Sequence, residues 1–377
     1  TAGQYTDAIT EGEDAAHQLK YRIKRTIPGS TLHVSTAALP KVSGVVGKEA
    51  WSLILDEPGG RNCGMDASGQ SSYTSLMALG VSSASSVDAC NESESLTLTV
   101  TRRYGAESPA PAPFEVRVIE EPRVTNLDQL PDGAGRAKPE VTEVAADGPG
   151  TPVVGGTALS DALSLTPGTY VEELVPGEAS FYRIPVAYGQ RLRFTLLGIG
   201  ESFPWKTSYR DTWFMVGADI LGPTARQAAI IRSAALWTGP DVSEPRPYWT
   251  PEIRYKNRSD VYTDGAALAG TYTIAVAITK DSKGIGAVEG IPVPVRFAVT
   301  VDGTESGKPE YAAAMPSTAS PSPSASATTP AANAKKPVEA DNGSVLPLVG
   351  GGLLTLAVLG GIGYAVWRRR AQGATHA

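Results

Sequence analysis

The sequence predicts an all-β protein built from two tandem β-sandwich domains, followed by an extended segment and one membrane-spanning helix. Three observations lead to this prediction. Short segments alternate apolar with polar residues, several sequence blocks recur in the same order later in the chain, and a long uncharged segment lies close to the C-terminus. Of the 377 residues, 41% are hydrophobic, which is enough for two packed domains.

The strand prediction comes from period-two alternation, which sends neighbouring side chains to opposite faces of a sheet. Turn residues such as Pro-Gly, Gly-Gly and Asp-Gly separate the alternating segments. Helical periodicity is hard to find before the C-terminal apolar segment, so packing of sheet on sheet is the expected architecture. The clearest strand segments are Leu96–Thr101, Phe114–Ile119, Arg191–Leu196, Tyr272–Ile278 and Val295–Val301.

An internal repeat indicates that the region before the C-terminal apolar segment arose by duplication. Blocks of matching residues recur in the same order, which a chance match of one tripeptide would not produce. In the first block of each repeat, a tyrosine stands seven positions before a glycine. The blocks are Tyr5–Glu13 with Tyr170–Glu178, Tyr21–Ile23 with Tyr182–Ile184, Ile27–Gly29 with Ala187–Gly189, Trp51–Pro58 with Trp213–Pro223, and Leu96–Arg102 plus Pro113–Ile119 with Tyr272–Lys280 plus Pro294–Val301.

The repeat sets the predicted domain boundaries. Sandwich domain 1 is expected over residues 1–121 and sandwich domain 2 over residues 165–302. The Pro/Gly/Asp-rich segment 122–164 is expected to be a linker that is in part packed. Residues 303–344 are rich in Pro, Ser and Ala, so they cannot bury enough apolar surface to fold, and we expect a stalk or a featureless linker there.

The segment from Val345 to Trp367 has no charged residue and is long enough to span a bilayer as a helix. Arg368, Arg369 and Arg370 follow directly, and positive charge marks the cytoplasmic side of a membrane helix. We therefore expect a single-pass membrane protein with residues 368–377 as a cytoplasmic tail. Its ectodomain would lie outside the cell, after a cleaved signal peptide. A buried core helix is the alternative, but core helices carry polar faces.

Charge and cysteine content indicate which partners and which kinds of site are expected. The net charge is −6, and no Lys/Arg-rich run precedes the C-terminus, so a nucleic-acid partner is not expected. Cys63 and Cys90 are the only two cysteines, and neither belongs to a Cys/His cluster with the spacing of a metal site. In an exported protein they are expected to form a disulfide, whereas two separate buried thiols are the alternative.

The second repeat resembles a known family. Between Tyr170 and Leu192, a tyrosine is followed by Pro-Gly-Glu, then Phe-Tyr-Arg-Ile and Gly-Gln-x-Leu. This pattern is similar to that of the bacterial pre-peptidase C-terminal domain, which implies a jelly-roll-like β-sandwich. The layout of the whole chain is similar to that of secreted envelope proteins of high-GC actinobacteria. Some members of the family bind calcium through paired aspartates, which Glu178–Tyr182 lacks, so the resemblance implies no calcium site here.

The sequence predicts no catalytic residue, metal site or cofactor. There is no GxSxG motif, and His33 is expected to be a solvent-facing strand residue. The acidic pairs Glu120/Glu121 and Glu172/Glu173 cannot converge, because adjacent strand residues point to opposite faces, and they are expected to be solvated. Asp66–Ser72 is expected to be a polar loop between the cysteines.

Aromatic residues gather in the middle of domain 2, within residues 200–255. On a β-sandwich, exposed Trp and Tyr side chains can stack on sugars or contact a protein partner. The alternative is that these rings fill the core and pack long loops. The candidate binding face consists of Trp205, Tyr209, Trp213, Trp237, Tyr248 and Trp249.

Two functions remain from the sequence. The first is a non-catalytic, membrane-anchored surface protein whose duplicated ectodomain binds or scaffolds another envelope component. The second is a cell-wall carbohydrate-binding protein that uses the aromatic-rich loops of domain 2. In both, the C-terminal helix lies in the lipid bilayer, and the identity of the partner or glycan is open.

Overall fold

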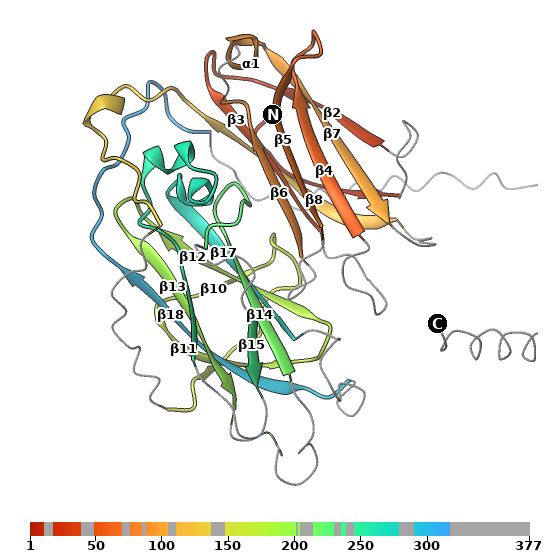
Figure 1. Cartoon of the computed structure of the whole chain (residues 1–377), viewed down its shortest axis with the longest axis vertical. Helices are drawn as coiled ribbons and strands as arrows, with labels where there is room; N and C mark the ends of the chain where they lie inside the picture. Colours follow the sequence, from red (N-terminus) through yellow and green to blue (C-terminus); the bar gives the residue numbers. More distant parts are fainter. Residues whose placement is uncertain are drawn as a thin grey trace, which may run out of the picture. The chain divides into compact units, whose positions relative to one another are not determined.

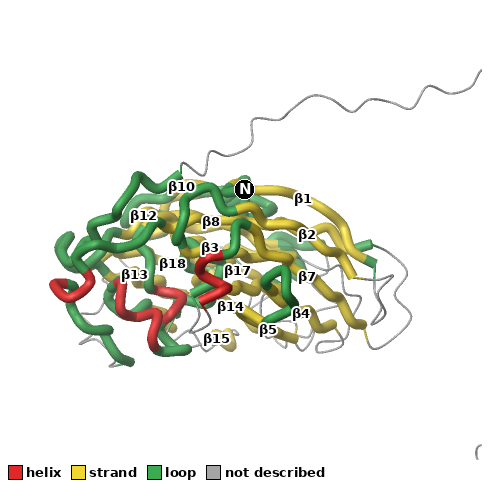
Figure 2. The backbone as a smooth tube through the Cα atoms, turned by 90° about the horizontal axis from the view of Figure 1, so that it is seen from above, coloured by secondary structure: helices red, strands yellow, loops and turns green. Residues whose placement is uncertain are grey.

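The computed structural model describes the part of the chain that contains both predicted domains. Strands make up most of this part, and the helical segments are single short turns (Figure 2). The described residues are 1–10, 18–38, 49–69, 76–84, 88–104, 111–136, 148–200, 203, 214–229, 235–238, 245–278 and 290–316.

Sandwich 1, which we define as β1–β8, consists of two four-stranded antiparallel sheets (Figure 1). One sheet has the order β1-β8-β3-β6 and the other has the order β2-β7-β4-β5. The elements are β1 (Gly3–Ile9), β2 (Gln18–Lys24), β3 (Thr31–Ala38), β4 (Glu49–Asp56), β5 (Asn62–Gly69), β6 (Met77–Ser82), α1 (Asp88–Glu92), β7 (Ser95–Tyr104) and β8 (Ala112–Glu121).

Sandwich 2, which we define as β9–β18, consists of two five-stranded sheets. Their orders are β9-β11-β18-β13-β16 and β10-β12-β17-β14-β15. The strands are β9 (Thr151–Pro152), β10 (Leu163–Ser164), β11 (Gly168–Leu174), β12 (Ala179–Val186), β13 (Arg191–Ile199), β14 (Phe214–Leu221), β15 (Ala235–Thr238), β16 (Arg246–Trp249), β17 (Gly270–Ile278) and β18 (Val293–Asp302). Three 3₁₀ turns complete the described elements: η2 (Leu127–Gln129), η3 (Tyr255–Ser259) and η4 (Asp264–Ala266).

The two sandwiches share one strand order. If β11–β18 are renumbered from one to eight, both sandwiches have one sheet ordered 1-8-3-6 and one ordered 2-7-4-5. This is the order of a jelly roll, in which eight antiparallel strands make two Greek keys. The strands β9 and β10 are additions, and each lies parallel to the edge strand that it extends.

Equivalent positions in the two repeats make equivalent contacts. The Tyr5 hydroxyl donates to the Thr1 carbonyl over 3.0 Å, and the Tyr170 hydroxyl donates to the Thr166 carbonyl over 2.6 Å. A glycine stands two positions before each tyrosine, directly beneath its ring. The strand registers make Leu55 the counterpart of Ile220, so Trp51 corresponds to Val216 and not, as predicted, to Trp213.

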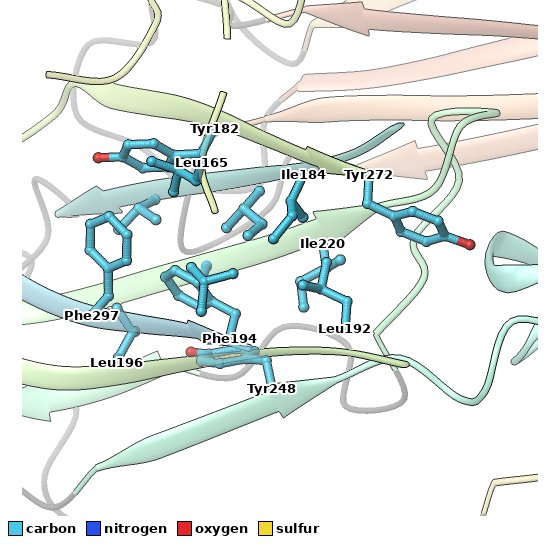
Figure 3. Close-up of a cluster of buried hydrophobic side chains, with 14 of the residues drawn as sticks. Leu165, Tyr182, Ile184, Leu192, Phe194, Leu196, Ile220, Tyr248, Tyr272 and Phe297 are labelled. Carbon is cyan, nitrogen blue, oxygen red and sulfur yellow. The ribbon is translucent and has the colours of Figure 1, made fainter. Parts of the chain in front are cut away.

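Each sandwich has its own hydrophobic core between its sheets. In β4, the alternate residues Trp51, Leu53 and Leu55 are buried, as expected for a strand with one face toward the core. Figure 3 shows the core of sandwich 2, where Phe194 and Phe297 lie between the layers with their ring centroids 5.3 Å apart. These cores account for the period-two pattern in the sequence.

Parts of the predicted linker and stalk are folded. The linker residues of β9 and β10 pair with β11 and β12, so sandwich 2 begins before residue 165. Residues 303–316 pack on the folded body, since Tyr311 bridges to Val124 and the Ser306 amide donates to the Tyr188 carbonyl. A stalk can therefore begin only after this segment. Both sandwiches belong to one compact unit, Thr1–Ser324.

Other expectations fall on β5 and on the C-terminal segment. Asp66 lies in β5, so the predicted polar loop Asp66–Ser72 is a strand as far as Gly69. Among the described residues, no helix has the length and apolar character needed to cross a bilayer. The predicted membrane span, Val345–Trp367, and the arginines after it lie outside the described residues.

Candidate functional site

The predicted aromatic face is described only in part. Tyr248 and Trp249 lie on β16 and are 0% and 4% exposed. Because β16 pairs with β13, Tyr248 packs against Phe194, with a centroid distance of 6.1 Å. These two side chains are therefore in the interior and do not form part of a surface, which corrects the expectation for them. The rest of this face stays a prediction, because its residues lie outside the part of the chain that the structure describes. They are Trp205, Tyr209, Trp213 and the side chain of Trp237.

Cys63 and Cys90 form a disulfide, as predicted. Cys63 lies on β5 and Cys90 on α1, with their Cα atoms 5.5 Å apart. Both residues are buried at one end of the core of sandwich 1. The bond closes the segment that contains β5 and β6, and a disulfide is characteristic of proteins that fold in an oxidising compartment.

The acidic pairs are not the solvated surface that the sequence predicts. Glu120, Glu121 and Glu172 are buried, and only Glu173 is exposed. The geometric part of the argument is correct for the second pair, because Glu172 faces the interior while its neighbour faces out. Burial of a carboxylate is unfavourable unless hydrogen bonds or positive charges compensate, so each of these residues requires partners.

Glu120 holds the turn between β2 and β3. Its carboxylate accepts hydrogen bonds from the amides of Thr26 and Ile27, each 2.7 Å, and from the Ser30 hydroxyl over 2.8 Å. Burial alone raises the pKa of Glu120, but these hydrogen bonds outweigh it and keep the pKa below its ordinary value. The residue therefore stays ionised and fixes the turn at Gly29, which has a φ of 70°.

Glu121 is the centre of a polar junction between the two sandwiches. It ends β8, and its side chain is 1% exposed. The carboxylate contacts His33 Nε2 at 2.9 Å on the neighbouring strand β3. It also accepts two hydrogen bonds of 3.0 Å from Arg258 in η3 of sandwich 2, and one of 3.1 Å from the Tyr311 hydroxyl. We call Glu121, His33, Arg258, Tyr311 and Tyr188 the junction cluster.

The junction cluster keeps Glu121 ionised. Burial alone raises the pKa of Glu121, but the hydrogen bond with His33 and the electrostatic effects of His33 and Arg258 lower it to about 2. The expectation that His33 faces solvent is therefore wrong, because its side chain is only 11% exposed and contacts this carboxylate. A carboxylate with so low a pKa is a poor proton acceptor near neutral pH. The arrangement therefore suits the joining of the two sandwiches better than acid–base catalysis by Glu121.

Tyrosine side chains make up part of the junction cluster and pack against it. The Tyr188 and Tyr311 hydroxyls are 3.3 Å apart, and the Arg258 guanidinium lies 3.5 Å from the centroid of the Tyr255 ring. Burial raises the pKa of Tyr188 to about 12, and burial together with the nearby Glu121 charge raises the pKa of Tyr311. Both hydroxyls therefore stay protonated, and Tyr311 remains a donor to the carboxylate.

An apolar contact also joins the sandwiches. Ala37 and Leu76 of sandwich 1 pack with Phe181 and Ala275 of sandwich 2 in one buried cluster. The sandwiches approach closely at Gly80 of β6, where a Cβ atom would lie 2.6 Å from Arg226 Cγ and 2.7 Å from the Thr224 carbonyl oxygen, in the turn after β14. The interface is therefore close-packed as well as charged, and the two sandwiches form one body.

The residues that the structure describes contain no group of three or more His, Cys, Asp or Glu side chains that could hold a metal ion. The counterpart of the His33–Glu121 pair in sandwich 2 is an ion pair between Arg193 and Asp302. Asp302 is 43% exposed, so the same cross-strand pair that forms the junction in sandwich 1 lies at the surface in sandwich 2. In sandwich 1, the pair that recurs in both repeats therefore contacts the other repeat, through Glu121.

No known family model and no curated protein sequence matches this chain. Among solved structures, the tandem CBM22-1-CBM22-2 domain of Paenibacillus barcinonensis Xyn10C is 10% identical, covers 80% of this chain and 94% of its own, and has a TM-score of 0.21. A protein of Parabacteroides distasonis described as secreted is 8% identical, with coverages of 78% and 87% and a TM-score of 0.19. These TM-scores are too low to transfer a fold or a function to this chain.

Proposed function

We propose that the chain is a non-catalytic, single-pass cell-surface protein whose two β-sandwiches act as one rigid platform that binds or scaffolds another envelope component. The observation that carries the proposal is the junction cluster. Its central carboxylate, Glu121, is held by Arg258 and Tyr311 from beyond sandwich 1, so the relative orientation of the repeats is set by directional contacts. A fixed orientation is useful to a scaffold, which must present two surfaces at a constant geometry.

Other features support an extracellular setting. The Cys63–Cys90 disulfide favours an oxidising compartment. The uncharged segment Val345–Trp367 and the three arginines after it favour a membrane anchor with the sandwiches outside. The pattern in Tyr170–Leu192 favours a relationship to the pre-peptidase C-terminal domains of secreted bacterial proteins.

Protease treatment of intact cells tests the topology. The full chain carries an epitope tag after Ala377, and protease is added outside before the cells are lysed. We expect the sandwiches to be removed while a short tagged fragment stays in the membrane fraction. A chain that stays intact on whole cells and is cut only after lysis contradicts a surface location.

Cross-linking on intact cells, followed by mass spectrometry, tests the scaffold. We expect the wild-type chain to be linked to one envelope component reproducibly. The Arg258→Met variant, which loosens the junction cluster, is expected to lose or spread these cross-links, whereas Arg254→Met, a nearby surface change, is expected to preserve them. Identical cross-links in all three chains would mean that the partner does not depend on the fixed orientation of the two sandwiches.

Glycan binding through domain 2 is a second candidate, favoured by the gathering of Trp205, Tyr209, Trp213 and Trp237 in one stretch of sequence. Alanine variants of these residues separate it from the first candidate. Reduced retention on insoluble peptidoglycan, with unchanged cross-linking to an envelope protein, is the outcome expected if these rings stack on sugars.

A further inference from the structure

The outer face of the sheet β2-β7-β4-β5 carries a line of positive charge. The residues Leu96, Leu98 and Val100 of β7 point into the core, so the alternate residues of this sheet face outward. On the edge strand β2, the outward residues are Lys20, Arg22 and Lys24, and all three are exposed. We call these three residues the basic stripe.

The described residues leave the basic stripe exposed. Arg22 Nε donates to the Ser95 hydroxyl over 3.1 Å, a contact that leaves the charge of the guanidinium uncompensated. Within the described residues, none of the three cations forms an ion pair. The chain as a whole has a net charge of −6, so this local excess of positive charge is not a general property of its surface.

The same face of the other jelly roll is already a docking surface. The registers of β2 with β7 and of β12 with β17 make Phe181 the counterpart of Lys20. Phe181 is 0% exposed, and it packs in the apolar cluster that joins the sandwiches. Arg22 corresponds to Arg183, which is also exposed. The two copies of this face therefore differ at Lys20, whose counterpart is an apolar anchor, and at Lys24, whose counterpart is Pro185. The described residues bring no covering element to the cations of sandwich 1.

The arrangement of the cations favours a linear anion. Alternate residues of a strand lie about 7 Å apart, so the basic stripe spans about 14 Å along one line. Across the sheet, the row from Lys20 continues through the uncharged Thr99, Ile54 and Met65, and the row from Arg22 continues through Thr97 to the acidic Asp56. The positive charge therefore does not extend beyond β2 in either row. A chain with regularly spaced charges can follow such a line, whereas a bilayer surface is better matched by positive charge spread over two dimensions.

We propose that the basic stripe binds an anionic polysaccharide of the cell envelope, with successive acidic groups of the glycan on Lys20, Arg22 and Lys24. This inference rests on the proposed surface location and names the chemical class of one envelope component. Binding of this kind is electrostatic, so it weakens as salt is added.

The test uses the full chain in a nonionic detergent, with dextran sulfate as the polyanion and unmodified dextran as the neutral match. The variant K20Q/R22Q/K24Q removes the basic stripe. The control variant R123Q/R246Q/K308Q removes the same amount of charge from exposed positions elsewhere on the described surface. Mixed micelles of the same detergent with and without phosphatidylglycerol form the lipid arm of the experiment.

We expect the wild-type chain to bind dextran sulfate but not dextran, with an affinity that falls as salt rises. The stripe variant should lose about tenfold or more in affinity and most of the salt dependence, whereas the control variant should stay within about twofold of wild type. Equal losses in the two variants, no loss in the stripe variant, or stronger binding to micelles that contain phosphatidylglycerol than to dextran sulfate would each overturn the proposal. Unchanged cross-linking of the stripe variant on cells would then show that the scaffold function stands without it.

Discussion

Arg258 donates two hydrogen bonds, each 3.0 Å long, to the Glu121 carboxylate, from a position 137 residues further along the chain. Glu121 closes the last strand of sandwich 1, while Arg258 lies in a short 3₁₀ turn of sandwich 2. A paired geometry of this kind is both stronger and more directional than a single hydrogen bond. The pair therefore sets how one jelly roll is oriented on the other.

Replacement of Arg258 by methionine should destabilise the protein by about 3 kcal/mol, because it leaves a buried carboxylate with fewer partners. The matched control is Arg254→Met, which breaks a pair with Glu252 whose two side chains are 28% and 29% exposed, and an exposed hydrogen bond to the Asp132 carbonyl. That change should cost about 1 kcal/mol or less. Urea unfolding of the three chains checks both values, and equal losses would mean that the Glu121 pair contributes no more than a surface ion pair.

Glu121 should make the protein sensitive to acid. Its pKa is lowered to about 2 in the fold, against about 4.3 in an unfolded chain. Its contribution, about 3 kcal/mol, is present above the unfolded pKa and is lost as the pH falls from there toward the folded pKa. The measurement is the urea midpoint between neutral pH and pH ~3. Glu121→Gln should be less stable at neutral pH and show a shallower decline, whereas parallel curves would contradict the assignment.

Glu172 should act in the opposite sense. Burial raises its pKa, although Gly155 N and the Ser180 hydroxyl donate to its Oε1 atom over 2.7 and 2.8 Å. For a carboxyl with a raised pKa, the contribution to stability is greatest below the unfolded pKa and is lost as the pH rises through the folded pKa. The stability of Glu172→Gln relative to wild type should therefore improve from acidic to mildly alkaline pH. A difference that does not change with pH would exclude this role.

Tyr21 and Tyr182 occupy equivalent positions but should respond differently to the loss of the hydroxyl. Tyr21 donates to Asp7 over 2.7 Å, whereas the fully buried Tyr182 hydroxyl has no hydrogen-bond partner among the described protein atoms. Tyr21→Phe should cost about 1 kcal/mol, and Tyr182→Phe should be neutral or stabilising, because it removes a buried polar atom without breaking a bond. Thermal unfolding of the two variants compares them, and a larger loss for Tyr182→Phe would reverse the expectation.

The fold of each domain could be predicted from the sequence because it depends on local patterns. The alternation in Leu96–Thr101 and Tyr272–Ile278 places these segments on the equivalent strands β7 and β17. The matched blocks at Tyr21 and Tyr182 likewise lie on β2 and β12. In contrast, β9 and β10 have two residues each, which is too short for any periodicity to be visible.

The junction cluster could not be predicted, because its partners come from segments far apart in the sequence. Glu120 and Glu121 resemble any charged pair at the end of a strand, and charged residues are usually exposed. The available signal was the register of the repeat, which aligns Glu121 with Asp302 and His33 with Arg193, and so indicates that a cross-strand pair of a basic and an acidic residue recurs within the duplication. Nothing local pointed to Arg258 or Tyr311.

The central claim is that the two jelly rolls form one rigid body, and calorimetric unfolding of the full chain tests it most directly. We predict a single transition for wild type, with the calorimetric enthalpy equal to the van't Hoff enthalpy. Gly80→Leu, which places a side chain where Arg226 and the Thr224 carbonyl already lie, should split this transition into two. Two independent transitions in the wild-type chain, unaffected by this substitution, would contradict the claim.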